Sequence, residues 1–138
     1  AQVVDVRVGY DVDSLQADLA AALPGETIHA SNFAGGILLT GDTVYPGRLY
    51  VRDAPVFTAS IARLVEFTKD KPVTHVLGTH IEQSDTPFLD YKVGTAYQPK
   101  EHRLELSRGH LLELLEAMRA LGARPPRYAL RDFTIYPR

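Results

Sequence analysis

Two short apolar runs, each ending in a glycine turn, constrain the fold of this chain more than any other feature. Residues 37–43 read Ile-Leu-Leu-Thr-Gly-Asp-Thr, and residues 73–80 read Val-Thr-His-Val-Leu-Gly-Thr-His. Apolar runs of this length, bounded by glycine, are typical of strands buried on both faces of a sheet. Each turn then presents one side chain of a type that binds metals, the carboxylate of Asp42 and the imidazole of His80. Neighbouring strands would bring these two side chains together.

Strand and helix patterns alternate along the rest of the chain. The clearest helices are 55–69, where Pro55 suits the first turn, and 107–121, where Ser107 caps a leucine-rich face and Gly122 follows. We also expect strands at 4–8, 27–30, 49–51 and 128–136, a helix from residue 13 or 14 to residue 23, a loop at 32–36, and a long irregular segment at 82–103. This alternation predicts an α/β class, with a mixed sheet and flanking helices. We expect one domain over 1–138, in which a strand-helix element (1–35) precedes a larger portion (36–138).

Composition excludes several classes of site. The chain has no cysteine, so disulfides, thiolate zinc sites and cysteine nucleophiles are ruled out, and any zinc must be held by histidine and carboxylate. A formal net charge of -2 gives no general attraction to nucleic acid or to an anionic membrane. No apolar run approaches the length of a membrane span. We therefore expect neither a nucleic-acid partner nor a membrane span, while the cellular compartment stays open.

The segment from Gly36 to about Gly122 resembles the C-terminal portion of metallo-β-lactamase-fold hydrolases. The stretches that carry the resemblance are 36–51, 75–82 and 97–102, followed by the leucine-rich helix. The resemblance implies one half of an αββα fold and metal-dependent hydrolysis of a small-molecule substrate. It also implies that Asp42 bridges two metal ions, zinc being the expected metal, and that His80 completes the second site, so that both are expected to be catalytic.

The same resemblance has a large gap. The family's main metal signature, His-x-His-x-Asp-His, does not occur in this chain. Two protein ligands fall short of the three that are usual in a catalytic zinc site. The chain is therefore expected to be incomplete or inactive alone, with the other ligands supplied by a second copy, a companion chain or a missing segment.

A weaker resemblance covers residues 3–44, which are similar to the small βαβ-type modules that precede the channel domain of bacterial secretins. That resemblance implies a non-catalytic interaction or assembly module, with contacts made through the N-terminal element. The two resemblances overlap at 36–44. The hydrolase resemblance covers more of the chain and has the rarer motifs, so it is favoured.

Each candidate residue also has a purely structural interpretation. Asp42 could be a turn aspartate that binds its own backbone, and His80 could be satisfied by hydrogen bonds alone. Odd spacing along the strand places His75 on the opposite face from His80. Glu82 could support the His80 imidazole or lie in solvent, with solvent the favoured interpretation. The remaining candidates are the upstream His29, two histidines without an assigned role (His102 and His110), and four tyrosines around the expected mouth of the site (Tyr45, Tyr50, Tyr91 and Tyr97).

Overall fold

A five-stranded mixed sheet forms the centre of the fold in the computed structural model, which describes residues 2–8 and 28–138. Its order is β1 (Gln2–Val8), β2 (Ile28–Ala34), β3 (Ile37–Gly41), β5 (His75–Gly78) and β6 (Glu105–Leu106). The pairs β1–β2 and β3–β5 are parallel, whereas β2–β3 and β5–β6 are antiparallel. This arrangement confirms the α/β class. The helix expected at 13–23 lies outside the described residues.

A smaller three-stranded sheet adjoins this one, in the order β4 (Arg48–Val51), β8 (Thr134–Pro137) and β7 (Tyr128–Ala129). The expectation of one continuous strand at 128–136 was wrong, because β7 and β8 form an antiparallel pair with a turn between them. Leu130 N donates to Phe133 O across that turn. The expected loop at 32–36 was also wrong in part, since β2 continues to Ala34 and only Gly35 and Gly36 form the turn, both with positive φ.

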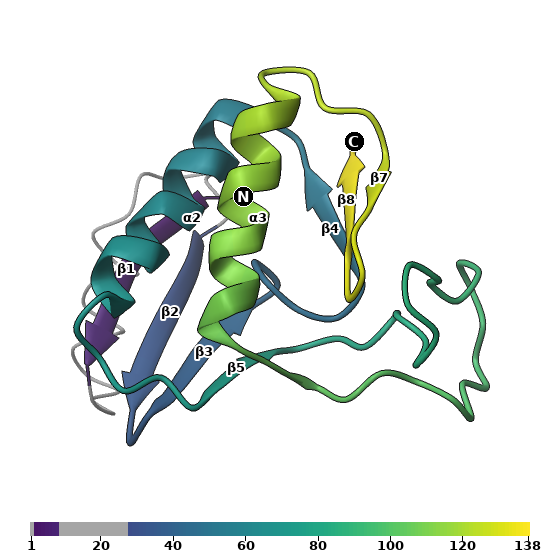
Figure 1. The fold of residues 1–138 in the computed structure, drawn as a ribbon, viewed down its shortest axis with the longest axis horizontal. Coiled ribbons are helices and arrows are strands. Elements are labelled where there is room, and N and C mark those ends of the chain that lie inside the picture. Colours follow the sequence, from purple (N-terminus) through teal and green to yellow (C-terminus); the bar gives the residue numbers. More distant parts are fainter. Residues whose placement is uncertain (1, 9–27) are drawn as a thin grey trace.

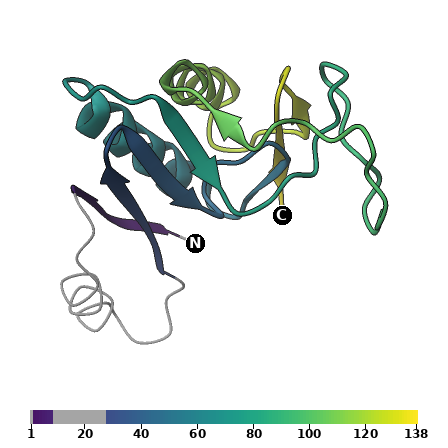
Figure 2. The same cartoon turned by 90° about the horizontal axis from the view of Figure 1, so that it is seen from below.

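Two helices, α2 (Ala54–Thr68) and α3 (Arg108–Leu121), lie on the same side of the five-stranded sheet (Figures 1 and 2). The expected start of α2 is confirmed: Asp53 accepts a hydrogen bond from Val56 N, and Pro55 occupies the first turn. Ser107 and Gly122 bound α3 as expected. The buried stripes of both helices pack over Leu38 and Val76 of the sheet and form one continuous apolar core.

The other face of the central strands is not buried, contrary to expectation. Along β3, Leu38 and Thr40 are fully buried, while Ile37 is 37% exposed and Leu39 is 42% exposed. In β5 only Val76 is buried, and His75 is exposed. The apolar runs predicted strands covered on both faces, but in the described residues the helices cover one face only. We refer to the exposed side as the outer face of the sheet.

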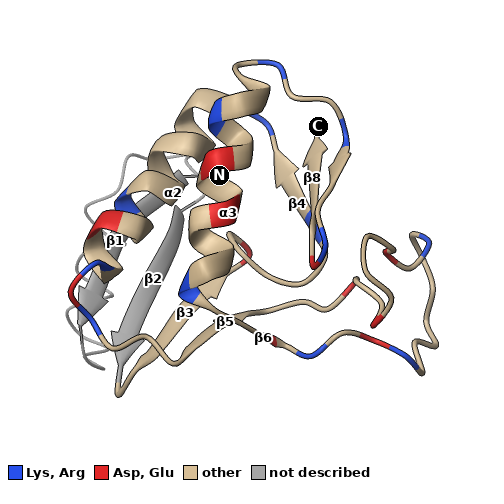
Figure 3. Ribbon diagram, in the orientation of Figure 1, with Lys and Arg blue, Asp and Glu red and all other residues tan. Residues whose placement is uncertain are grey.

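The long segment 82–103, here called the arm, projects away from the sheets and helices (Figures 1 and 2). It has internal order, because isolated bridges join Gln83 to Asp90 and Ser84 to Glu101. Acidic and basic positions are interspersed along it (Figure 3). The arm begins two residues after His80 and returns to the body at β6, just before α3, so its two ends connect the sheet edge with the start of that helix.

Candidate metal-binding site at the ends of β3 and β5

The parallel pairing of β3 and β5 brings Asp42 and His80 to the same edge of the sheet. Leu39 pairs with Leu77 and Gly41 pairs with Gly78, with a register shift between these two pairs. Thr79 N then donates to Gly41 O at 3.1 Å, just beyond the ends of the strands. Because parallel strands end at the same edge of a sheet, the residues that follow them emerge side by side. The two strand ends are thus neighbours, as the sequence indicated.

A tight turn after β3 fixes the direction of Asp42. Thr43 N donates to Thr40 O at 3.0 Å, and the buried Thr40 hydroxyl donates to Val44 O at 2.7 Å. Gly41 has φ of +54°, a left-handed conformation that side chains rarely adopt. Gly78 permits the close approach of this turn, since a Cβ atom on it would lie 2.4 Å from Val44 O. The backbone conformation at residue 41 and the close contact at residue 78 therefore explain why both positions are glycine.

The two side chains contact each other directly. His80 Nε2 lies 3.0 Å from Asp42 Oδ1, and the side chains are 53% and 51% exposed. The Thr79 hydroxyl donates to the same Asp42 oxygen. The His80 ring stands edge-on to Tyr45, with ring centroids 5.2 Å apart. The result is a braced carboxylate–imidazole pair with one side open to solvent.

Tyr45 supports the pair from the core. Burial, together with the charge of Glu82, raises the pKa of its phenol well above the usual value, so the hydroxyl stays neutral near pH 7. That hydroxyl donates to Arg48 O. The sequence placed four tyrosines around the expected mouth of the site, but among the described residues only Tyr45 packs against the His80 ring. Tyr50 packs on Tyr136, Tyr91 accepts from Lys100 N within the arm, and Tyr97 is 79% exposed.

The pair fits part of a zinc site. Zinc binds imidazole nitrogen and carboxylate oxygen at about 2.0–2.2 Å, so two ligand atoms of one ion lie about 3 Å apart or slightly more. The separation of 3.0 Å between Asp42 Oδ1 and His80 Nε2 suits this, and it suits a direct hydrogen bond equally well. Among the residues the structure describes, no group of three or more histidine or acidic side chains is arranged to hold a metal ion.

Glu82 has a role that neither sequence interpretation gave it. Its carboxylate accepts from Arg48 N at 2.8 Å and lies 3.1 Å from the Arg48 guanidinium. Arg48, nearly fully buried, also donates to Asp90 at 3.0 Å and to Tyr91 O at 2.6 Å. Arg48 thus ties the start of the arm, two residues after His80, to β4. The sequence carried no local signal for this network, because its members are 34 to 43 positions apart.

The imidazoles of His75, His102 and His110 contact groups other than the pair. His75 is exposed on β5, where its Nδ1 contacts the Thr74 hydroxyl at 2.9 Å. The backbone of His29 pairs with Val3 in β1. His102 and His110, which had no assigned role, both contact Asp132. None of these three described imidazoles joins His80, so the predicted metal ligands remain Asp42 and His80.

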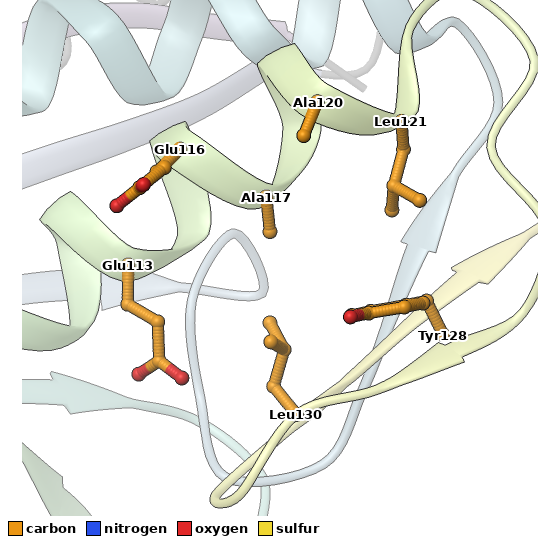
Figure 4. A pocket seen from close by; sticks show the side chains of 7 residues that line it. All are labelled: Glu113, Glu116, Ala117, Ala120, Leu121, Tyr128 and Leu130. Atoms are coloured by element: carbon orange, nitrogen blue, oxygen red, sulfur yellow. The ribbon is translucent and has the colours of Figure 1, made fainter.

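A separate hollow of about 220 Å³ lies between α3 and the C-terminal strands (Figure 4). Its walls are mostly apolar side chains, with two carboxylates; the lining residues are Glu113, Glu116, Ala117, Ala120, Leu121, Tyr128 and Leu130. Neither predicted site residue lines it. The hollow is therefore distinct from the Asp42–His80 pair.

Comparison of the chain with protein-family models, with curated proteins and with solved structures found no match. Within the described part of the chain, none of the helices has the length and apolar character needed to cross a bilayer.

Proposed function

We propose that this chain is a metal-dependent hydrolase-like protein of the metallo-β-lactamase superfamily, in which Asp42 and His80 hold zinc. The observation that carries the proposal is the 3.0 Å contact between Asp42 Oδ1 and His80 Nε2 at the ends of two parallel strands. The reaction class, metal-dependent hydrolysis, comes from the resemblance of residues 36–122 to metallo-β-lactamase-fold hydrolases. The parent chemistry is hydrolysis of a small-molecule substrate, and the finer fold assignment is one half of the αββα architecture.

Each residue has a defined task in this proposal. Asp42 and His80 bind the ion, Thr79 orients the Asp42 carboxylate, and the edge of the Tyr45 ring limits rotation of the imidazole. Bound zinc would supply Lewis acidity and a water that loses its proton near neutral pH. The half-exposed pair leaves room for a substrate to approach from the solvent side.

Two ligands do not complete a catalytic zinc site, so the proposal includes a partner, either a second copy of the chain or a companion chain. The outer face of the sheet supports this part. Ile37 and Leu39 are exposed there on a strand whose C-terminal end leads into Asp42. β3 and β5 form a parallel pair, and all-parallel sheets are covered on both faces, so apolar side chains exposed on this strand are suited to contact with another chain. A partner packed on this face would lie next to the metal-binding pair and could complete its ligands.

Zinc titration of the purified protein tests the assignment of the pair. We expect weak zinc binding by the wild-type chain, because only two side chains hold the ion. Asp42→Asn and His80→Gln should each weaken binding about tenfold or more, since each removes one of the two ligands. Isothermal titration calorimetry measures the change. His75→Gln is the matched control, because His75 is an exposed histidine at the start of β5 whose imidazole contacts the Thr74 hydroxyl.

Equal zinc affinity in the wild type, Asp42→Asn and His80→Gln would contradict the proposal. The variants should keep the far-ultraviolet circular dichroism spectrum of the wild type, because both altered side chains are about half exposed. Thermal stability in the presence of zinc gives a second measurement, since a ligand that binds only the folded state raises it.

A non-catalytic assembly module is the second candidate, and the exposed apolar residues of the outer face favour it too. Under that alternative the chain associates through this face without zinc. Leu39→Lys should then abolish association, as measured by light scattering, while chelator leaves the wild-type complex unchanged. A complex that needs both zinc and Asp42 would instead support the hydrolase-like site.

A further inference from the structure

One carboxylate, Asp132, contacts two imidazoles at the place where the arm rejoins the body. Asp132 lies in the turn between β7 and β8. Its Oδ1 is 2.9 Å from His102 Nε2 at the end of the arm, and its Oδ2 is 2.7 Å from His110 Nε2 in the first turn of α3. All three side chains are largely buried, with exposed fractions of 16–22%. We call this cluster the Asp132 clasp.

The second nitrogen of each ring decides how many protons that ring holds. His110 Nδ1 lies 2.9 Å from Ser107 N, which can only donate, so His110 Nδ1 is an acceptor. His110 therefore carries its proton on Nε2 and donates it to Asp132. A metal ion on Nε2 would leave this ring with no proton at all, so the cluster does not suit metal binding.

His102 is in the opposite situation. Its Nδ1 lies 2.6 Å from Arg103 O, which can only accept, and its Nε2 faces the Asp132 carboxylate. Both hydrogen bonds form only when the ring holds two protons. Loss of either proton would turn a lone pair of His102 toward an oxygen, and one of the two contacts would then break.

We infer that the Asp132 clasp is a proton-dependent latch, in which doubly protonated His102 fastens the returning end of the arm to the β7–β8 turn and to α3. When His102 loses one proton at higher pH, this end of the arm loosens. The neutral His110 keeps its own bond to Asp132, so the turn stays attached to α3. The latch therefore acts on the arm and not on the whole fold.

The charged and titratable groups around His102 come from three elements: the β7–β8 turn, the start of α3 and the arm itself. The turn between β7 and β8 contributes Asp132 and Arg131, whose Nε lies 3.8 Å from Asp132 Oδ1 and is mostly solvent-exposed. The start of α3 contributes His110, and the arm itself contributes the neighbouring Glu101 and Arg103. Arg103 points to Glu105 at 3.6 Å. Asp132 is the only carboxylate described in contact with the His102 ring.

The acid limit of the latch follows from Asp132. Burial by itself would raise the pKa of this carboxyl, but hydrogen bonds from His110 and His102 outweigh burial and hold the pKa below its usual value. A lowered pKa means that the carboxylate stabilises the folded state above the unfolded pKa and loses this effect as pH falls through the folded pKa. The latch thus stays closed through the mildly acidic range.

Amide hydrogen exchange tests the latch at the base of the arm. His102 N donates to Gln83 O and Asp85 N donates to Lys100 O, both at 2.8 Å, so these amides report on how firmly the returning end of the arm is held against its outgoing end. We expect their protection factors to be about tenfold lower at a higher pH, at which His102 holds one proton, than at a lower pH, at which it holds two, because one charge-assisted hydrogen bond is lost. His102→Gln and Asp132→Asn should show low protection at both pH values. His75→Gln should behave as the wild type.

Nitrogen-15 spectra of the imidazoles give an independent readout that a failure to fold would not mimic. At the lower pH, His102 should carry protons on both nitrogens and His110 a single proton on Nε2, because the hydrogen-bond partners of each ring require these protons. A singly protonated His102 at that pH would overturn the inference. Protection factors with the same pH dependence in Asp132→Asn as in the wild type would overturn it as well.

Discussion

Replacing Gly78 with alanine is expected to destabilise the protein by about 3 kcal/mol, near the upper end of the usual cost of overpacking. The added Cβ would lie 2.4 Å from Val44 O and 2.5 Å from Tyr45 Cβ. Both contacts are with the turn that carries Asp42, and neither is the end of a flexible side chain. Relief requires β5 to separate from that turn. Chemical denaturation with urea measures the change in the free energy of unfolding.

The matched control for this substitution is Gly109→Ala. Gly109 lies in the first turn of α3, where the nearest atom to an added Cβ is Ser107 Oγ at 3.4 Å. Alanine has the higher helix propensity, so we expect no loss of stability there. Equal stability of Gly78→Ala and the wild type would show that the two strand ends do not approach as closely as described. Gly78→Ala should also weaken zinc binding, because the same movement separates Asp42 from His80.

Replacing Arg48 with methionine is expected to cost about 3 kcal/mol, toward the low end for breaking a buried ion pair. Methionine preserves much of the side-chain volume but removes the positive charge that pairs with Glu82. Asp90 also loses Arg48 and retains its ion pair with Arg127. The estimate is at the low end because Glu82 is 22% exposed and retains some solvent. Urea denaturation again measures the loss.

Two further variants make the Arg48 result specific. Arg103→Met removes a largely exposed arginine that pairs with Glu105 at 3.6 Å, and it should cost less than about 1 kcal/mol. Arg48→Lys keeps the charge but loses the forked geometry, so its stability should lie between those of Arg48→Met and the wild type. A loss below about 1 kcal/mol for Arg48→Met would mean that the arm is not held by this network.

Local sequence signals were enough to place α2 and α3. Pro55 predicted the start of α2, and Ser107 and Gly122 predicted the bounds of α3, because such signals act within one turn of the chain. The leucine-rich face of α3 is narrower than its sequence indicates, since Leu112 is 43% exposed. The adjacency of Asp42 and His80 also followed from the sequence, since two strands that end in similar glycine turns suggested neighbours.

Contacts between distant segments could not be predicted in the same way. Arg48 reaches Asp90 across 42 positions, and His102 reaches Asp132 across 30, so no local periodicity marks either pair. The turn at 130–133 was missed because its flanking strands alternate in a single pattern. The exposure of Ile37 and Leu39 was missed because an apolar run does not reveal whether anything covers its second face.

The central claim is that Asp42 and His80 hold one cation between them, and the His80 imidazole reports on this most directly. Titration of zinc into nitrogen-15-labelled protein should shift the Nε2 signal of His80 to a metal-bound position, while the signals of His75, His102 and His110 stay in place. The His80 shift should disappear in Asp42→Asn. An unchanged His80 Nε2 signal at saturating zinc, or the same shift in Asp42→Asn, would contradict the account.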